Sequence, residues 1–486
     1  MPARRHGGGG GHHRGPVKRT KPSDGPARSA RDAVAPWQSV PYAEQLARKH
    51  AVLSGALQSL STRFNVPVDP VLASPLTTGY RNKVDFTIGY DKDRNAAVGF
   101  RVSSFLSSDG ATVEAPDDCA GTVPALGMDV ARRAVEFIRA STLLPFDHET
   151  HVGFWRALTV RISEANKQLM LCVRAAPHTN DVEAGKAEMT RFVQAMAREP
   201  FADGQTVTSA LVQWHGGLAS QPPADLEHEV ALGADHIVEG LLGMNFVVSP
   251  GAFFQANTPC AQVLFELCRS KVAGEASAAL LDICCGTGVI GQLLAKAFSV
   301  VVGVDMNGPG IADARRNAAN NGVTHAHYIH AKAEDVLARL LGTPDGKQRP
   351  ALDAVDEAEL VRAKAKTDVC ATCVAIVDPP RPGLHKSVLR ALLENAKVRT
   401  VVYVSCSPTG SFGVDAAALC EGRRGALPFE LASMQPVDMF PNTEHCELVA
   451  VFHRRRAAAA SPVVTPPPAA VGAAAAAEPA SSDARP

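Results

Sequence analysis

With 486 residues, the chain has room for two or three domains and for a core that needs no disulfide bonds. Its 49 basic and 49 acidic residues balance, so no overall field attracts a polyanion, and a nucleic-acid role must rest on local patches or a shaped site. The eleven cysteines lack the spacing of a disulfide framework, and no segment holds the roughly 20 consecutive apolar residues of a membrane span. We therefore expect free thiols and no membrane partner.

Both ends of the chain have low-complexity compositions. Residues 1–36 are rich in Gly, Pro, Arg and His, and residues 456–486 are rich in Ala, Pro and Ser, so we expect both to be disordered tails. The basic residues of the first tail suit an RNA-binding arm, a nuclear signal or part of a transit peptide. The compartment therefore stays open, with the cytoplasm or nucleus favoured and the mitochondrion as the alternative.

Two regions of different pattern lie between the tails. Residues 37–250 begin with a charged helical stretch and continue in short alternating segments such as "NKVDFTIGY", which predicts a strand-rich α+β region. In residues 251–455, apolar strands alternate with helical stretches, the pattern of a parallel sheet covered by helices. Residues 341–372 form a polar insertion, and their single CxxC (Cys370, Cys373) supplies only half a zinc site, so we expect no metal.

The clearest fold signal is one strand–helix–strand unit. A buried strand at 280–283 runs into a turn that contains Gly286 and Gly288, and a second strand after the following helix ends in Asp305. The glycines let the backbone approach a ligand, and the carboxylate is placed to accept hydrogen bonds from a ribose diol. A dinucleotide would use the same features, but the loop lacks a full GxGxxG and resembles the first motif of class I methyltransferases. This favours S-adenosylmethionine as the cofactor.

Three further strands place chemically active residues at the same edge of the predicted sheet. The strand "CVAIV" ends at Asp378, which two prolines separate from Arg381. The next strand, "TVVYV", leads to Cys406, and Glu447 directly precedes the apolar strand "LVAVF". Ligands bind at the carboxyl ends of parallel strands, so we expect Asp378 and Cys406 to lie in the site.

A cysteine beside a methyl donor indicates a particular chemistry. Carbon 5 of uracil is a poor nucleophile, but a thiolate added to carbon 6 makes carbon 5 able to attack a methyl group. A general base must then remove the proton from carbon 5 before elimination restores the ring. Glu447 is the best candidate, because partial desolvation would raise its pKa, while Glu444 and His445 are alternatives. Cys406 taken alone could equally be a small buried hydrophobe.

Assembled, these residues resemble the RNA uridine-5-methyltransferases, and more specifically the eukaryotic tRNA (uracil-5-)-methyltransferases that act on the T-loop uridine, position 54. The resemblance spans about residues 40–454 and rests on "YRNKVDFTIGY", "SPGAFFQANTPCAQVLF", "LLDICCGTGVIG", "VDPPRPGLH", "VVYVSCSP" and "MFPNTEHCE". It implies a Rossmann-like methyltransferase domain behind an RNA-binding region, with Cys406 as the nucleophile and Glu447 as the base. It also implies a methyl-donor pocket lined by Gln255, Asp305, Asp378 and the backbone around Cys284, Gly286, Gly288 and Val289.

Contacts to the RNA are predicted from both regions. Phe253 and Phe254 could pack on the cofactor or on a flipped uracil, or could equally belong to the core. The polar run Arg81, Asn82 and Lys83 begins a strand of the first region and suits phosphate or base contacts. We add Arg381 to this set, and we expect a monomer that binds tRNA through its T loop.

The sequence departs from the family pattern at two positions, and several competing functions stay open. Asp305 stands where the family more often has Glu, and Ser407 replaces the usual Asn after the cysteine; neither change removes a required group. A cytosine-5 RNA methyltransferase would use the same addition to carbon 6, and a methyltransferase for an exocyclic amine has a similar Asp-Pro-Pro motif but needs neither Cys406 nor Glu447. A tRNA-folding aid with dispensable catalysis is the non-enzymatic alternative.

Overall fold

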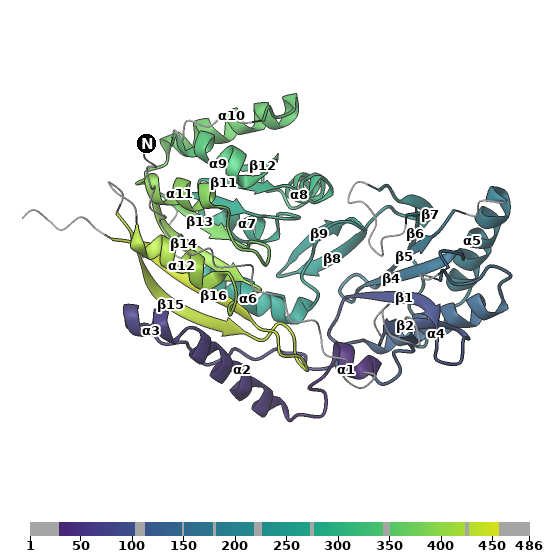
Figure 1. The fold of residues 1–486 in the computed structure, drawn as a ribbon. Coiled ribbons are helices and arrows are strands. Elements are labelled where there is room, and N and C mark those ends of the chain that lie inside the picture. Colours follow the sequence, from purple (N-terminus) through teal and green to yellow (C-terminus); the bar gives the residue numbers. More distant parts are fainter. Residues whose placement is uncertain are drawn as a thin grey trace, which may run out of the picture.

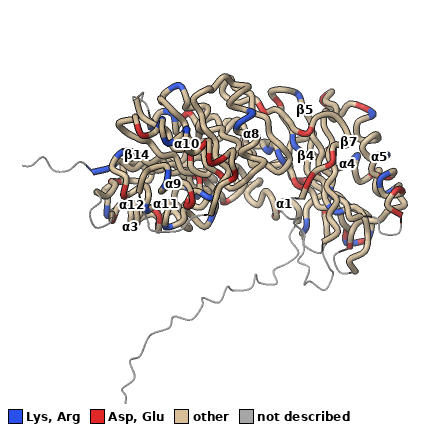
Figure 2. Tube along the Cα trace, turned by 90° about the horizontal axis from the view of Figure 1, so that it is seen from above, with Lys and Arg blue, Asp and Glu red and all other residues tan. Residues whose placement is uncertain are grey.

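The computed structural model describes residues 29–102, 112–147, 150–177, 181–217, 226–272, 277–343, 350–422 and 427–455. Two seven-stranded sheets form two lobes, and a two-stranded hairpin lies between them (Figure 1). Basic and acidic residues are interspersed over both lobes (Figure 2), consistent with the balanced composition. Among the described residues, no helix is both long and apolar enough to cross a membrane.

The second sheet confirms the predicted α/β architecture. Its strand order is β12-β11-β10-β13-β14-β16-β15. The strands from β12 to β14 in this order are parallel, and β16 is antiparallel to both of its neighbours, β14 and β15. The strands are β10 (Ala279–Ile283), β11 (Val300–Asp305), β12 (Ala326–His330), β13 (Cys373–Val377), β14 (Val398–Ser405), β15 (Phe429–Val437) and β16 (Glu447–Arg454). The chain order reverses between β10 and β13, and that reversal opens a crevice at the carboxyl edge of the sheet.

Helices cover both faces of this sheet, which explains its continuous apolar strands. They are α6 (Thr258–Lys271), α7 (Val289–Leu294), α8 (Gly308–Asn320), α9 (Ala333–Leu341), α10 (Ala354–Val369), α11 (Lys386–Glu394) and α12 (Phe412–Glu421), with a 3₁₀ turn, η1, at Ala295–Ala297. In β10, Leu281 points into the core beneath α9 and α11, and Leu280 points into the core beneath α6 and α7. Helix α10 lies within the predicted insertion.

The first sheet is the predicted strand-rich region, and its order is β3-β2-β1-β4-β5-β6-β7. Its strands are β1 (Lys83–Tyr90), β2 (Ala96–Arg101), β3 (Val113–Glu114), β4 (Trp155–Ser163), β5 (Gln168–Ala175), β6 (Ser209–Trp214) and β7 (Glu229–Gly233). All pairs are antiparallel except β5 and β6, which the crossover helix α5 (Val182–Ala197) joins. Together with α4 (Ala125–Ala140), α5 covers one face of the sheet around a core that includes Trp155 and Phe192.

The predicted boundary near residue 250 does not separate the two lobes. Helices α2 (Tyr42–Ala56) and α3 (Gln58–Phe64), which the sequence assigned to the first region, lie under β15 and β16 of the second sheet (Figure 1). Leu53 of α2, Leu60 of α3 and Leu57 between the two helices join the core of that sheet. The hairpin of β8 (Ile237–Leu241) and β9 (Met244–Val248) also belongs to the core around α6 and α8.

The predicted first tail extends too far into the chain. Residues 30–34 form the short helix α1 (Ala30–Val34), which begins with a reciprocal capping box between Ser29 and Asp32. Ala30 and Ala35 are buried, so this segment gains enough apolar contact to be ordered. Residues 1–28 of the predicted first tail and the whole predicted second tail lie outside the described residues.

Candidate active site

The turn after β10 is shaped by three residues with positive φ. Cys284, Gly286 and Gly288 have φ values of 65°, 53° and 74°. A Cβ at Gly288 would lie 2.8 Å from the ring of Tyr328, so only glycine fits there. Buried Asp282 accepts a hydrogen bond from the backbone N of Gly291 at 2.8 Å, and burial raises its pKa to about 7. The turn is therefore held from below while its backbone faces the crevice.

Asp305 supports the same turn from the end of β11. Its Oδ2 accepts a hydrogen bond from the backbone N of Gly286 at 2.9 Å, and its Oδ1 accepts one from the backbone N of Asn307 at 2.8 Å. A carboxylate has about four lone-pair positions, so each oxygen can still accept from a ligand hydroxyl. Asp305 can therefore hold the turn and still contact a ligand.

A pocket opens above this turn. It is lined by Phe253, Phe254, Gln255, Phe265, Cys284, Cys285, Gly286, Thr287, Val289, Ile290 and Asp378. Most of the predicted cofactor residues therefore line one pocket, and Asp305 and Gly288 belong to the turn beneath it without being among its lining residues. The two phenylalanines differ: Phe253 is 64% exposed, while Phe254 is 5% exposed and its ring centroid lies 6.4 Å from that of Phe246. Phe254 belongs to the core that forms the pocket wall, whereas Phe253 is largely open to solvent at the pocket.

Residues of the first lobe hold the loop that carries Phe253 and Gln255. The side-chain amide of Asn82 donates to the backbone O of Gln255 and to Oγ1 of Thr258, both at 2.8 Å, and its backbone N donates to Ala256 O at 2.7 Å. Buried Arg161 donates to the backbone O of Ala252 at 3.1 Å. The amide donors of Asn82 are used on the pocket loop, and its contact with RNA stays a prediction.

The other two members of that polar run are placed differently. Lys83 forms an ion pair with Asp85, with Nζ and Oδ2 3.2 Å apart, and the Arg81 Nε donates to the backbone O of Lys83 at 3.1 Å. Both side chains are partly exposed. Their contact with RNA stays a prediction.

The predicted nucleophile and base meet at the edge of the second sheet. Glu447 is the first residue of β16, and Cys406 directly follows β14; because Ser405 pairs with Leu448, the two residues lie at adjacent strand ends. Asp378 follows β13 on the other side of β14. Because β16 runs antiparallel to β14, Glu447 lies beside Cys406 although it is 41 positions later in the chain.

Burial and mutual charge set the protonation of this group. Burial, with the negative charge of Asp378 added, raises the pKa of Glu447 to about 8, although Arg381 opposes the shift. Burial, Asp282 and Asp305 raise the pKa of Asp378 to about 7. Burial, Glu447 and Asp378 raise the pKa of the Cys406 thiol, and Arg381 lowers it. Arg381 is exposed and is the cation that counters the carboxylates here.

A second layer of residues, which sequence reasoning missed, holds the segment from Arg381 to Leu384 that follows Asp378. The carboxylate of Asp415 accepts a hydrogen bond from the Tyr403 hydroxyl at 2.7 Å and from the backbone N of Leu384 at 2.8 Å. The Ser411 hydroxyl donates to the backbone O of Arg381 at 2.9 Å. A buried tyrosine inside an apolar strand was the available signal, because its hydroxyl needs a partner.

Comparison with known proteins decides the family. The family model for tRNA (uracil-5-)-methyltransferase matches residues 228–455. A human tRNA (uracil-5-)-methyltransferase homolog A is 31% identical over 456 residues, which cover 89% of this chain and 68% of the human protein. The chain belongs to the tRNA (uracil-5-)-methyltransferase family. A mouse protein, tRNA (uracil-5-)-methyltransferase homolog B, is also 31% identical, over 87% of this chain and 85% of its own length.

The family confirms the resemblance drawn from the motifs, including the enzyme class and tRNA as the substrate. A solved structure supports the fold: Pyrococcus abyssi tRNA (uracil-54, C5)-methyltransferase superposes with a TM-score of 0.59 at 24% identity and covers 88% of this chain and 86% of its own. That archaeal protein was crystallised with S-adenosyl-L-homocysteine.

Proposed function

We propose that this tRNA (uracil-5-)-methyltransferase methylates carbon 5 of the T-loop uridine at position 54, with Cys406 as the nucleophile, Glu447 as the base and S-adenosylmethionine as the methyl donor. The observation that carries the proposal is the meeting of Cys406 and buried Glu447 at adjacent strand ends. The pocket that opens beside them contains Asp378, whose charge acts on both. The Pyrococcus relative, named for uracil-54, supports the choice of position.

The residues present fit the methyl donor. The pocket has apolar walls, an exposed ring at Phe253, the buried amide of Gln255 and a carboxylate at Asp378. Such a set suits a nucleoside that carries a positive charge, because the apolar walls exclude water and the carboxylate attracts the cation. Gln255, Asp305, Asp378 and the backbone at Cys284, Gly286 and Val289 would hold it. When bound, S-adenosylmethionine supplies an electrophilic methyl group on a positively charged sulfur.

Cys406 begins the reaction on the uracil ring. Its thiol loses a proton to solvent, the sulfur forms a bond to carbon 6, and the displaced electron pair spreads onto carbon 5 and oxygen 4. The methyl donor, held by Gln255 and Asp378, would supply the methyl group that this activated carbon 5 accepts. Arg381 favours the thiolate, because its positive charge lowers the pKa of Cys406 against the carboxylates.

Glu447 completes the reaction. Its carboxylate takes the proton from carbon 5, the electron pair re-forms the ring double bond, and the bond between carbon 6 and the Cys406 sulfur breaks. A carboxylate whose pKa is about 8 accepts this proton more readily than an ordinary one. Since the carboxylate form is required, the release step should speed up as the pH rises toward 8.

The RNA would bind across both lobes. We infer that Arg381 and the exposed ring of Phe253 contact the flipped uridine or its neighbours, and that Arg81 and Lys83 of the first lobe contact the backbone. Extruding a base from the folded T loop costs a few kcal/mol, which contacts to the backbone must offset. The first lobe is the part of the chain that would supply them.

Labelled methyl transfer to unmodified tRNA transcript tests the proposal. We expect label in 5-methyluridine that maps to the T loop, detected by nucleoside mass spectrometry. Cys406→Ala should abolish the product while tRNA affinity changes by less than about tenfold, or roughly 1.4 kcal/mol. Cys420→Ala, which removes a buried thiol of α12 outside the site, is the matched control. Retained turnover in Cys406→Ala, or label in another nucleoside, would overturn the proposal.

A further inference from the structure

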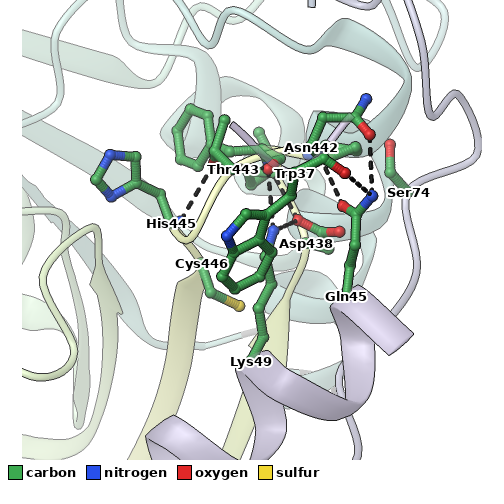
Figure 3. A network of polar contacts seen from close by, with 12 residues as sticks. Trp37, Gln45, Lys49, Ser74, Asp438, Asn442, Thr443, His445 and Cys446 are labelled. Atoms are coloured by element: carbon green, nitrogen blue, oxygen red, sulfur yellow. Dashed lines mark hydrogen bonds and ion pairs between the residues drawn. The ribbon is translucent and has the colours of Figure 1, made fainter. Parts of the chain in front are cut away.

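The loop between β15 and β16, residues 438–446, leads directly into Glu447, and it rests on helix α2. Two polar side chains of α2, Gln45 and Lys49, are each only 1% exposed. They lie one helical turn apart on the same face, and Figure 3 shows Gln45 directed to Asn442 and Lys49 directed to Asp438. In the sequence this helix reads as a charged surface element, so two buried polar residues on it require an explanation.

Lys49 forms a fully buried ion pair. Its Nζ lies 2.6 Å from Oδ1 of Asp438, both side chains are 0% exposed, and Nζ also donates to the backbone O of Phe440 at 2.9 Å. Removing two charges from water costs free energy, so apolar residues of similar size would often stabilise a core as well or better. The directional contacts instead fix one position for the start of the loop.

Gln45 holds the middle of the same loop. Its Nε2 donates to Asn442 Oδ1 at 2.9 Å, and its Oε1 accepts from the Asn442 backbone N at 2.7 Å. Asn442 has a φ of 65°, and its side-chain amide donates to the backbone O of Thr77 and of Gly121, at 2.8 and 2.7 Å. The Gln45 contacts thus orient an asparagine that ties the loop to the first lobe.

We propose that Gln45 and Lys49 are positioning residues for Glu447: they fix the 438–446 loop so that the carboxylate stays in place to take the proton from carbon 5. Within the described part of the chain, Oε2 of Glu447 is buried and has no hydrogen-bond partner. The position of the carboxylate therefore depends on the backbone that carries it. The inference rests on the proposed role of Glu447 as the base, and it adds which residues hold the carboxylate in position.

The prediction is specific to one half of the reaction. Addition of Cys406 and methyl transfer occur before the base acts, so a displaced loop should leave these steps nearly intact. A misplacement of about 1 Å can cost about 100-fold in rate, so we expect elimination to slow by about ten- to a hundredfold. The methylated RNA should then remain covalently bound to Cys406.

Single-turnover reactions with labelled methyl donor and tRNA transcript test this in the full chain. Lys49→Met and Gln45→Met keep side-chain length and remove the polar contacts; the second is the milder change if the first folds poorly. Methyl transfer is measured as total label in RNA, and release is measured as the fraction of label that migrates with protein on a denaturing gel. Glu447→Gln serves as the reference for a fully trapped adduct.

Arg454→Met is the matched control for loss of a buried cation. Arg454 ends the strand that Glu447 begins, about 23 Å away, and donates to the backbone O of Val398, Leu392 and Leu393, among others. It should lower the melting temperature without trapping RNA. Trapped RNA in Lys49→Met and Gln45→Met, but not in Arg454→Met, supports the inference. Methyl transfer and release that decline together in the two α2 variants would overturn it. No adduct in Glu447→Gln would instead overturn the proposed base.

Discussion

Replacing Glu447 with glutamine should change how the stability of the protein depends on pH. The folded-state pKa of this carboxyl is about 8, against an ordinary value of 4.5. Between these values the folded protein keeps a proton that the unfolded chain has lost, so a rise in pH favours unfolding. The contribution of Glu447 to stability is therefore fully present below pH 4.5 and is lost as the pH rises through 8. Glutamine has no proton to lose.

The size of the effect follows from the two pKa values. A tenfold change in a proton equilibrium corresponds to about 1.4 kcal/mol, so between pH 5 and pH 9 the wild-type protein should lose about 4 kcal/mol more than Glu447→Gln. The new amide leaves a buried donor in place of a carboxyl oxygen that has no partner among the described residues, which costs about 1–3 kcal/mol at every pH. Only the change of the difference with pH is therefore diagnostic.

Urea unfolding of both proteins at pH 5, 7 and 9 measures this difference. The free energy of unfolding of Glu447→Gln, relative to the wild type, should rise by about 4 kcal/mol across the series. Glu444→Gln removes an exposed glutamate from the same loop and should show a much smaller trend. A relative stability of Glu447→Gln that stays constant from pH 5 to pH 9 would mean that the carboxyl titrates normally, and the argument that burial prepares it as a base would fail.

Three further substitutions separate the roles of residues around the pocket. Asp305→Asn should raise the KM for S-adenosylmethionine about ten- to a hundredfold with little change in kcat, because a hydrogen bond to a charged acceptor contributes about 1.5–3 kcal/mol. Initial rates at saturating tRNA measure this change. Phe253→Ser should weaken binding of cofactor or tRNA by about 1–3 kcal/mol, measured by calorimetric titration, and leave the melting temperature nearly unchanged. Phe254→Ser, in the core, should instead lower the melting temperature. Asn82→Ala should weaken cofactor binding, because it releases the Gln255 loop, while tRNA affinity stays within about twofold. If a filter assay shows that tRNA affinity falls as much as cofactor affinity, Asn82 is an RNA contact.

The sequence by itself determined the catalytic lobe to a large extent. Continuous apolar strands and the Gly286 turn identified the parallel sheet, because a sheet buried on both faces and a backbone that closely approaches a ligand each limit which residues can occur. The carboxyl ends of such strands must meet at one edge, so the strand pattern alone was enough to assign Asp378 and Cys406 to one site.

Tertiary structure alone decided the contacts that join distant segments. Nothing local distinguishes Asn82 as a loop support from Asn82 as an RNA contact, because the same amide donors serve either partner. Gln45 and Lys49 look like surface residues of a charged helix, and only the packing of α2 under β15 and β16 buries them against the Glu447 loop. Local pattern fixes the period and the ends of an element, whereas its polar partners depend on which surface packs against it.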